Sequence, residues 1–335
     1  MAAEGAQPGW PSELSAVFER SVTVEYGSLT RSGRPITVPV SPYIGADGRT
    51  LDVSTGLTYP AKADRARHDP RVCLLYSDPI GPGMGRLPTV LVQGHAAVRD
   101  ADLQGNTDRY VQLAAAKYPA TIKGVPRVLL SRLAYYYARI WIEVTPLRVR
   151  WWPDRNLDSE PNQWLAPADT DLPQSDPPPR GAAPPPWRQP PLDWRSVVGD
   201  VINRLKLSDV TAVDPSGYPV CVPVRLGALE GDTLALEVGS GAPELVQGPA
   251  CLSVHSHGEV FSGQENRTLI GRLLPAAGGH AFVVERALGD WSAAGNKLRM
   301  VAGFVGKAPK LAPRLKAEAA RRNQPVPKVR LSPSN

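Results

Sequence analysis

A group of hydroxyl and cationic side chains between positions 54 and 71 could bind a phosphate dianion. Ser54, Thr55 and Thr58 supply hydroxyls, and Lys62 and Arg65 follow within a few residues. A lysine offers phosphate a point charge, an arginine offers a planar fork of donors, and hydroxyls add further hydrogen bonds. The alternative interpretation of the same residues is the charged, solvated start of a helix.

The chain contains a second copy of this region that lacks the charges. Residues 31–40 (RSGRPITVPV) and 215–224 (PSGYPVCVPV) are identical at six of ten positions, and further matching residues follow in the same order in both copies. Residues 54–71 hold four Lys or Arg, whereas the corresponding residues 238–250 hold none. An internal repeat predicts a duplicated structural unit. The asymmetry indicates that one copy binds an anion and that the other has lost this role.

The elements that position these residues are short strands separated by turns. In the first copy the β-branched and alternating runs predict strands at 36–40, 50–54, 71–76, 89–98 and 138–144. Ser32-Gly33 and Asp47-Gly48 predict tight turns. A short helix opened by Ser12 is expected over 12–21, and further helical patterns lie at 107–117 and 126–137. Because strands follow strands directly, a doubly wound parallel sheet is disfavoured, and we expect a mainly β fold with minor α and one small barrel per unit.

Composition divides the chain into four parts. We expect a first unit over 12–152, a proline-rich linker over 153–191, a second unit over 192–300 that opens with a helix at 194–205, and a basic tail over 301–335. From residue 297 onward there are ten Lys or Arg and one acid, so the rest of the chain carries a net charge of about −3. We expect a solvated tail with at most a short helix at 311–322; a weak polyanion contact is the alternative.

Several classes of partner and site are disfavoured. The body is not basic, so no specific nucleic acid is expected, and the chain has no run of 18 apolar residues, so no membrane is expected. Cys73, Cys221 and Cys251 lie in apolar runs, and no signal-peptide pattern is present, which favours a reducing, cytoplasmic location. His255 and His257 share one face of a strand and could contact a metal or haem. Without a third ligand, we expect no metal site.

Motifs of the first unit resemble a known family when taken in order. They are a G-x-P…P-V run, a strand ending in Ser54-Thr55, Lys62 a few residues later, DPRV at 69–72, V-x-G-x-A at 92–96, and a closing P-x-R-V-x-W that ends at Trp151. Their order is similar to that of the pyridoxamine-phosphate-oxidase-like split-barrel family. The resemblance covers about 130 residues of the first unit well and about 90 of the second weakly.

The resemblance implies a split-barrel fold that dimerises and binds FMN, or the related deazaflavin, at the interface. Here the second unit would replace the second subunit and form an intramolecular pseudo-dimer, and further oligomerisation stays open. Lys62 would hold the phosphate, with Arg65 as a helper. The remaining cofactor contacts would be Val38, Pro39, Val40, Ser41, Ser54, Thr55, Thr58, Trp151 and Trp152.

The resemblance also implies an FMN-dependent oxidoreductase that transfers hydride to or from a small organic substrate. A deazaflavin-dependent reductase and a non-catalytic flavin or haem binder are the alternatives. The arginines and histidine that hold the substrate phosphate in the oxidase itself have no clear match here, which disfavours pyridoxamine phosphate as substrate. No catalytic base can be named from the sequence, and a flavin needs little protein chemistry beyond binding and orientation.

Overall fold

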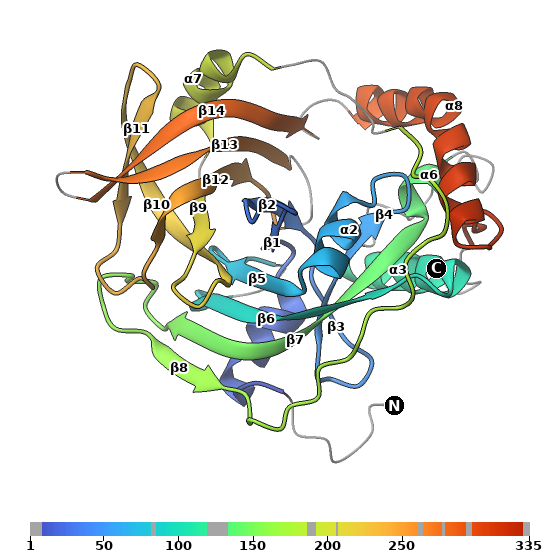
Figure 1. The fold of residues 1–335 in the computed structure, drawn as a ribbon, viewed down its shortest axis with the longest axis horizontal. Helices are drawn as coiled ribbons and strands as arrows, with labels where there is room; N and C mark the ends of the chain where they lie inside the picture. The colour runs from blue at the N-terminus through green and yellow to red at the C-terminus, as the bar shows by residue number, and fades with distance from the viewer. Residues whose placement is uncertain are drawn as a thin grey trace.

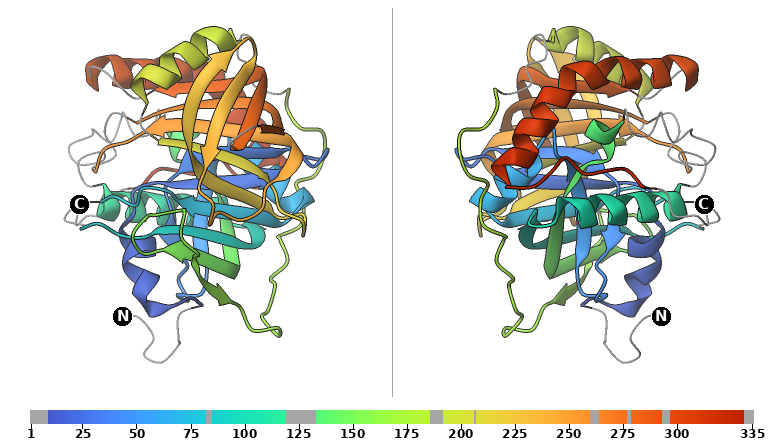
Figure 2. Two further views of the ribbon diagram at one scale, coloured as in Figure 1. Left: turned by 90° about the vertical axis from the view of Figure 1, so that its left-hand side faces the viewer. Right: turned by 90° about the vertical axis from the view of Figure 1, so that its right-hand side faces the viewer.

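Two β units pack against each other in the structure (Figure 1). The computed structural model describes residues 9–81, 85–118, 133–185, 192–205, 207–259, 264–276, 279–292 and 297–330. Figure 2 shows the yellow-to-orange barrel of the second unit stacked on the blue-to-green strands of the first. The predicted class, mainly β with minor α and two barrel-type units that form a pseudo-dimer within one chain, is confirmed.

The first unit is an antiparallel sheet with the strand order β2-β1-β5-β6-β7-β4-β3, and β8 pairs with β7. Its strands are β1 Val24–Leu29, β2 Pro35–Val40, β3 Tyr43–Ile44, β4 Leu51–Gly56, β5 Arg71–Tyr76, β6 Thr89–Arg99, β7 Arg139–Trp152 and β8 Asn162–Leu165. The predicted turns are present, since Gly33 and Gly48 adopt φ values of 75° and 71° that favour glycine.

Short helices cover this sheet at its ends and on one face. They are the 3-10 turn Ser12–Leu14, α1 Ser15–Arg20, α2 Ala61–His68, α3 Leu103–Lys117 and α6 Ala134–Tyr137. A helix was expected over 126–137; its last residues form α6, and 126–132 lie outside the described residues. The core of the unit is aliphatic and aromatic, with Phe18, Tyr26, Leu74 and Ile142 fully buried.

The second unit is a closed barrel with the order β10-β11-β14-β13-β12-β9. Its elements are α7 Trp194–Arg204, β9 Leu207–Val213, β10 Pro219–Glu230, β11 Thr233–Val238, β12 Val246–Ser256, β13 Glu265–Ala276 and β14 Gly279–Ser292. When β2, β1, β5, β6, β7 and β4 are matched in chain order with β10, β9, β12, β13, β14 and β11, the two units have the same strand order. This correspondence agrees with the repeat in the sequence.

Gly94 and Gly271, which occupy matching places in the two copies, sit at the same irregularity. The pairing of β6 with β7 shifts register at Gly94, and the pairing of β13 with β14 shifts at Gly271. A Cβ at Gly94 would lie 2.5 Å from the Thr145 carbonyl oxygen, and one at Gly271 would lie 2.1 Å from that of Val283. Both glycines are therefore needed where a bulge brings two backbones together. This bulge also lets β7 continue past Pro146, beyond the predicted end at 144.

The two units share a core at their interface. Cys73, Leu75 and Leu91 of the first unit cluster with the interior of the closed barrel, and so does Trp152. Thr37 Oγ1 and Thr211 Oγ1 lie 2.6 Å apart across this interface and are buried. The units are therefore one packed body rather than two tethered domains.

The segment after residue 297 corrects an expectation. In place of a largely solvated tail, the structure has the 25-residue helix α8, Lys297–Arg321. Leu311, Leu315 and Ala319 are buried in the core of the first unit. Their spacing of four residues forms one apolar stripe on a helix. The right-hand view of Figure 2 shows α8, in red, running along the side of the molecule.

The predicted linker lies on the surface of the first unit. Residues 153–185 are irregular apart from β8 and short turns, as expected from their prolines. Several hydrogen bonds fasten the segment to the end of β6. Among them, Val98 N–H donates to Ser175 Oγ at 3.0 Å, and Asp100 N–H donates to Asp176 Oδ2 at 2.7 Å. Residues 186–191 lie outside the described residues.

Candidate functional site

Lys62 and Arg65 lie one turn apart on α2, on the same side of the helix. Arg139, at the start of β7, is close enough to influence Lys62 electrostatically. Desolvation, and after it the positive charges of Arg65 and Arg139, lower the pKa of the Lys62 ammonium to about 7. Among the described residues Lys62 has neither a carboxylate partner nor a hydrogen-bond acceptor. Lys62 is half-buried, and an anion bound beside it would stabilise its charged form.

Arg139 is a member of this cation group that sequence reasoning missed. Its guanidinium lies 3.9 Å from the Tyr110 ring centroid and 4.9 Å from that of Tyr136, and its Nε is buried without a hydrogen-bond partner. The pairing of β4 with β7 sets Arg139 opposite Gly56, at the end of the predicted hydroxyl strand. The sequence signal that could have indicated Arg139 as an anion ligand was an arginine at the first position of an otherwise apolar strand.

Of the predicted hydroxyls, Ser54 and Thr55 lie in β4 and Thr58 lies in the turn between β4 and α2, and two of them already have backbone partners. Thr55 Oγ1 donates to the Tyr59 carbonyl at 2.8 Å, and Thr58 Oγ1 donates to the Tyr135 carbonyl at 3.2 Å. Ser54 is largely buried and makes no side-chain hydrogen bond with the described residues. The turn therefore positions Lys62, and among the three hydroxyls Ser54 is the one left available.

Residues 38–41, predicted to lie near a cofactor ring, are half-buried at the end of the first sheet. Among the described strands β2 pairs only with β1, so the backbone of its outer edge has no strand partner. Thr37 N–H of this edge instead points to Cys251 Sγ of the second unit at 3.4 Å. The hydroxyl of Ser41 accepts a hydrogen bond from the Tyr118 hydroxyl at 3.2 Å.

Trp151 and Trp152 are both nearly or fully buried, but on opposite faces of β7. Trp151 packs in the core of the first unit, and Trp152 packs in the shared core of the interface. The Trp152 Nε1 donates to the Ser159 carbonyl at 3.1 Å. Both rings have a packing role in the structure, and their contact with a cofactor stays a prediction.

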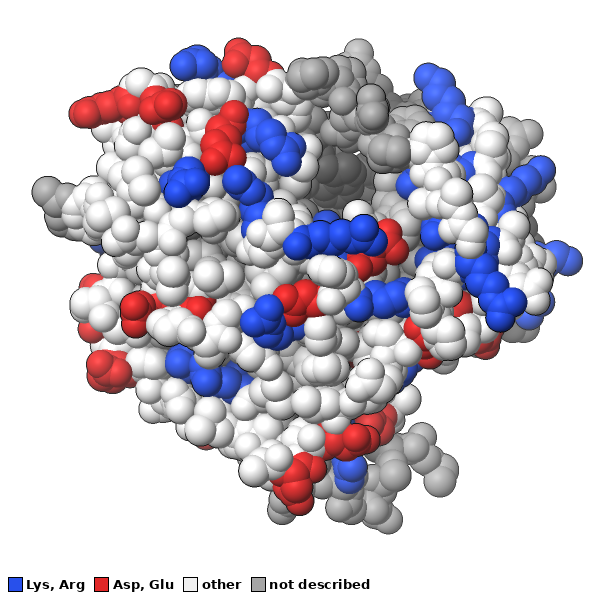
Figure 3. Space-filling view, viewed as in Figure 1, with Lys and Arg blue, Asp and Glu red and all other residues white. Residues whose placement is uncertain are grey.

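The face seen in Figure 3 is hollowed between the second unit and α8, with Lys and Arg side chains along its near rim. In the same view of Figure 1, α2, β1 and β2 lie at the base of this region. Arg65 extends from α2 toward β1, where its Nε donates to Ser28 Oγ at 2.9 Å. The cations of α2 thus lie on the side of the first unit that faces the second.

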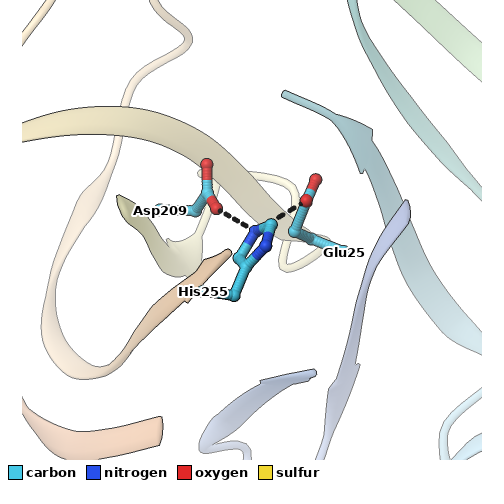
Figure 4. Close-up of side chains that lie close together, drawn as sticks. All are labelled: Glu25, Asp209 and His255. Atoms are coloured by element: carbon cyan, nitrogen blue, oxygen red, sulfur yellow. Dashed lines mark hydrogen bonds and ion pairs between the residues drawn. The ribbon is translucent and has the colours of Figure 1, made fainter. Parts of the chain in front are cut away.

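A second polar cluster lies buried at the interface (Figure 4). His255 Nε2 of β12 lies 2.8 Å from Glu25 Oε1 of β1 and 3.2 Å from Asp209 Oδ2 of β9. Burial opposes protonation of His255, but its bonds to the two carboxylates outweigh this and raise its pKa to about 10. Burial and, after it, the charge of Glu25 raise the pKa of Asp209 to about 7 against the opposing effect of His255.

His255 and His257 share one face of β12, as the sequence predicted. Their rings stack with centroids 5.5 Å apart and an interplanar angle of 15°. Burial and, after it, the nearby charge of His255 lower the pKa of His257 to about 4. The two histidines therefore differ: His255 holds a proton between carboxylates, and His257 stays neutral beside it.

No protein-family model and no curated protein matches the chain. It is similar to several solved structures. A pyridoxamine 5'-phosphate oxidase-related, FMN-binding protein from Nostoc punctiforme is 16% identical, with 49% of this chain and 94% of that one covered and a TM-score of 0.34. An F420 reductase is 16% identical, with 42% and 98% covered and a TM-score of 0.32. A FAD-binding protein from Mesorhizobium loti is 17% identical, with 40% and 86% covered and a TM-score of 0.26.

These names include the family that the motifs resemble, and each match covers less than half of this chain. None of the helices in the described residues has the length and apolar character needed to cross a bilayer.

Proposed function

We propose that the chain binds one flavin-type cofactor beside α2 and acts as a flavin-dependent oxidoreductase on a small organic substrate. The observation that carries this proposal is Lys62, a half-buried ammonium without a partner among the described residues, close to the charges of Arg65 and Arg139. The similar structures are named for FMN, FAD and F420, and FMN is the cofactor that we assign.

The residues fit a phosphate-bearing, planar cofactor. Lys62 supplies the charge that neutralises phosphate, and Arg65 adds a second cation on the same side of α2. The outer edge of β2 offers backbone groups to the polar edge of a ring. Ser54, in β4, has no other side-chain bond among the described residues. These residues would bind and orient the cofactor, while the packed second unit would exclude water.

The bound flavin would carry out the hydride transfer. The protein would bind and orient the flavin and would exclude water from it. The substrate would approach from the hollow seen in Figure 3. We propose a small organic molecule as the substrate, and further association of the chain is compatible with this proposal.

The visible absorption spectrum of purified protein tests the proposal, before and after addition of FMN. We expect the bands of oxidised flavin to remain after gel filtration in the native protein and to be lost in Lys62→Met. Addition of a nicotinamide donor should then bleach these bands. Retention of a deazaflavin but not FMN would support the reductase alternative, and a flavin that no donor reduces would support a carrier. A Soret band with added haem, and no flavin retention, would overturn the assignment.

A further inference from the structure

Three potential metal ligands from both units converge at the buried interface (Figure 4). They are Glu25 Oε1, Asp209 Oδ2 and His255 Nε2, and all lie within 4.8 Å of one another. Glu25 and Asp209 occupy the same position relative to the repeated motif, in the first strand of each unit. The packing of the two units therefore brings two matching carboxylates onto one imidazole.

Hydrogen bonding alone leaves this cluster incomplete. His255 Nε2 can donate a single proton, yet two carboxylate oxygens lie within 3.2 Å of it. His255 Nδ1 and Asp209 Oδ1 are buried without any hydrogen-bond partner in the described part of the chain. Native structures rarely leave buried polar atoms unpaired.

The charges are also unbalanced. Glu25 and Asp209 are almost completely buried, and in the described ranges neither forms an ion pair with Lys or Arg. Glu25 receives two further bonds, from the backbone and hydroxyl of Ser77, which orient it without adding charge. Two buried carboxylates on one imidazole call for a second positive charge. A divalent cation would provide it.

Unpartnered hydroxyls of the same barrel face give independent support. Ser253 lies directly opposite Asp209 on the neighbouring strand, and Thr268 lies opposite Ser253 on the next. Side chains opposite each other on antiparallel strands share one face of the sheet. Ser253 Oγ and Thr268 Oγ1 are buried without hydrogen-bond partners in the described residues. This face of the barrel therefore has polar atoms that the described protein groups leave unpaired.

We infer that Glu25, Asp209 and His255 form a binding site for one divalent transition metal such as Zn²⁺. The bound metal would link the two units through ligands from both. With metal–ligand bonds of about 2.1 Å, the separations of 2.8 and 3.2 Å correspond to ligand–metal–ligand angles of about 85° and 100°. Imidazole and carboxylate together suit Zn²⁺ and its neighbours better than Mg²⁺ or Ca²⁺. The site is separate from the cations of α2 and does not depend on the cofactor proposal.

Metal titration of the untagged, chelator-treated full chain tests the site. Zn²⁺ should bind with one equivalent per chain by calorimetry and raise the midpoint of thermal unfolding by at least about 3 °C. Co²⁺, used as a spectroscopic probe, should give visible d–d absorption that Zn²⁺ abolishes. Glu25→Gln and Asp209→Asn keep the side-chain size and should each weaken Zn²⁺ binding at least about 100-fold.

His95→Ala is the matched control, because His95 lies on β6 outside the cluster, and it should leave Zn²⁺ affinity unchanged. The inference is overturned if Zn²⁺, Co²⁺ and Mn²⁺ produce neither heat, absorption nor a thermal shift in the native chain. It is also overturned if Asp209→Asn, shown by circular dichroism to be folded, binds Zn²⁺ as tightly as the native chain.

Discussion

Lys62 is the residue on which the cofactor proposal depends, and its burial gives it a pH signature. Its pKa in the folded protein is lowered to about 7, first by burial and then by Arg65 and Arg139. A bound phosphate must raise that pKa, because an anion favours the charged ammonium. FMN affinity should therefore be constant just below pH 7 and weaken by up to about tenfold per pH unit above it. Fluorescence titration of FMN from about pH 6.5 to 9 measures this slope.

Lys117 provides a matched control for this experiment. Burial lowers its pKa to about 7 as well, but its Nζ donates to the Pro42 carbonyl at 2.7 Å and lies over the Tyr43 ring. Lys117→Met should leave FMN affinity and its pH slope unchanged. Lys62→Met should weaken binding at least about tenfold, which is about 1.4 kcal/mol, and remove the slope. A slope that persists in Lys62→Met would assign the titration to another group.

Arg322 joins two buried carboxylates that the chain brings together from distant segments. Its Nε lies 2.7 Å from Asp100 Oδ2 and its NH1 lies 2.8 Å from Glu318 Oε2, and all three side chains are at most 3% exposed. Arg322→Met should lower the free energy of unfolding by about 1.5–3 kcal/mol, because it removes a charged hydrogen bond from each carboxylate, while Arg67 and Arg321 remain as their partners. Arg330, which is largely exposed and 3.7 Å from Asp108, is the control and should change it by less than about 1 kcal/mol. Urea unfolding of both variants gives the comparison.

Helix α8 packs on the core of the first unit and bonds to the turn before α2, so its packing should support both stability and the cation group. Arg314 Nε of this helix donates to the Thr58 carbonyl at 2.6 Å, in the turn that precedes Lys62. Leu315→Ala should lower the free energy of unfolding by about 2–5 kcal/mol through the lost burial and the cavity. Lys316→Ala, one position along on the exposed side, should change it by less than about 0.5 kcal/mol. Equal effects in chemical denaturation would contradict this packing of α8.

The whole molecule should unfold in a single transition, because the two units share a core rather than a flexible boundary. Cys73, Leu75 and Trp152 pack among the barrel side chains, so opening the interface would expose buried apolar surface on both sides. Tryptophan fluorescence and far-ultraviolet circular dichroism should give the same midpoint. Two separated transitions would show that the units are independently stable.

Much of this architecture was predictable because the strands carry local signals. β5 matches its predicted bounds at both ends, and β2 and β6 match within a residue. The repeat predicted the matching strand orders, since Gly94 and Gly271 mark the same bulge. The candidate phosphate ligands Lys62 and Arg65 also carried a local signal, because the corresponding segment of the second copy, residues 238–250, contains no Lys or Arg.

Other features depend on contacts between distant segments, which spacing does not reveal. The apolar stripe of Leu311, Leu315 and Ala319 lies in a segment dominated by Lys, Arg and Pro, so composition favoured a solvated tail. Glu25 and Asp209 are ordinary acids in β-type runs, and only the packing of the units brings both to His255. A site at an interface requires the relative placement of the two units, which the repeat suggests but does not determine.

The number of FMN molecules bound per chain tests the central claim most directly. Two equivalent units would bind two, but the cations lie on the first unit alone, in α2, and residues 238–250 of the second contain none. Calorimetric titration of the native chain should give one FMN per chain, and none in Lys62→Met at the same concentrations. Two bound FMN, no binding of FMN or deazaflavin, or full binding in Lys62→Met would contradict the account.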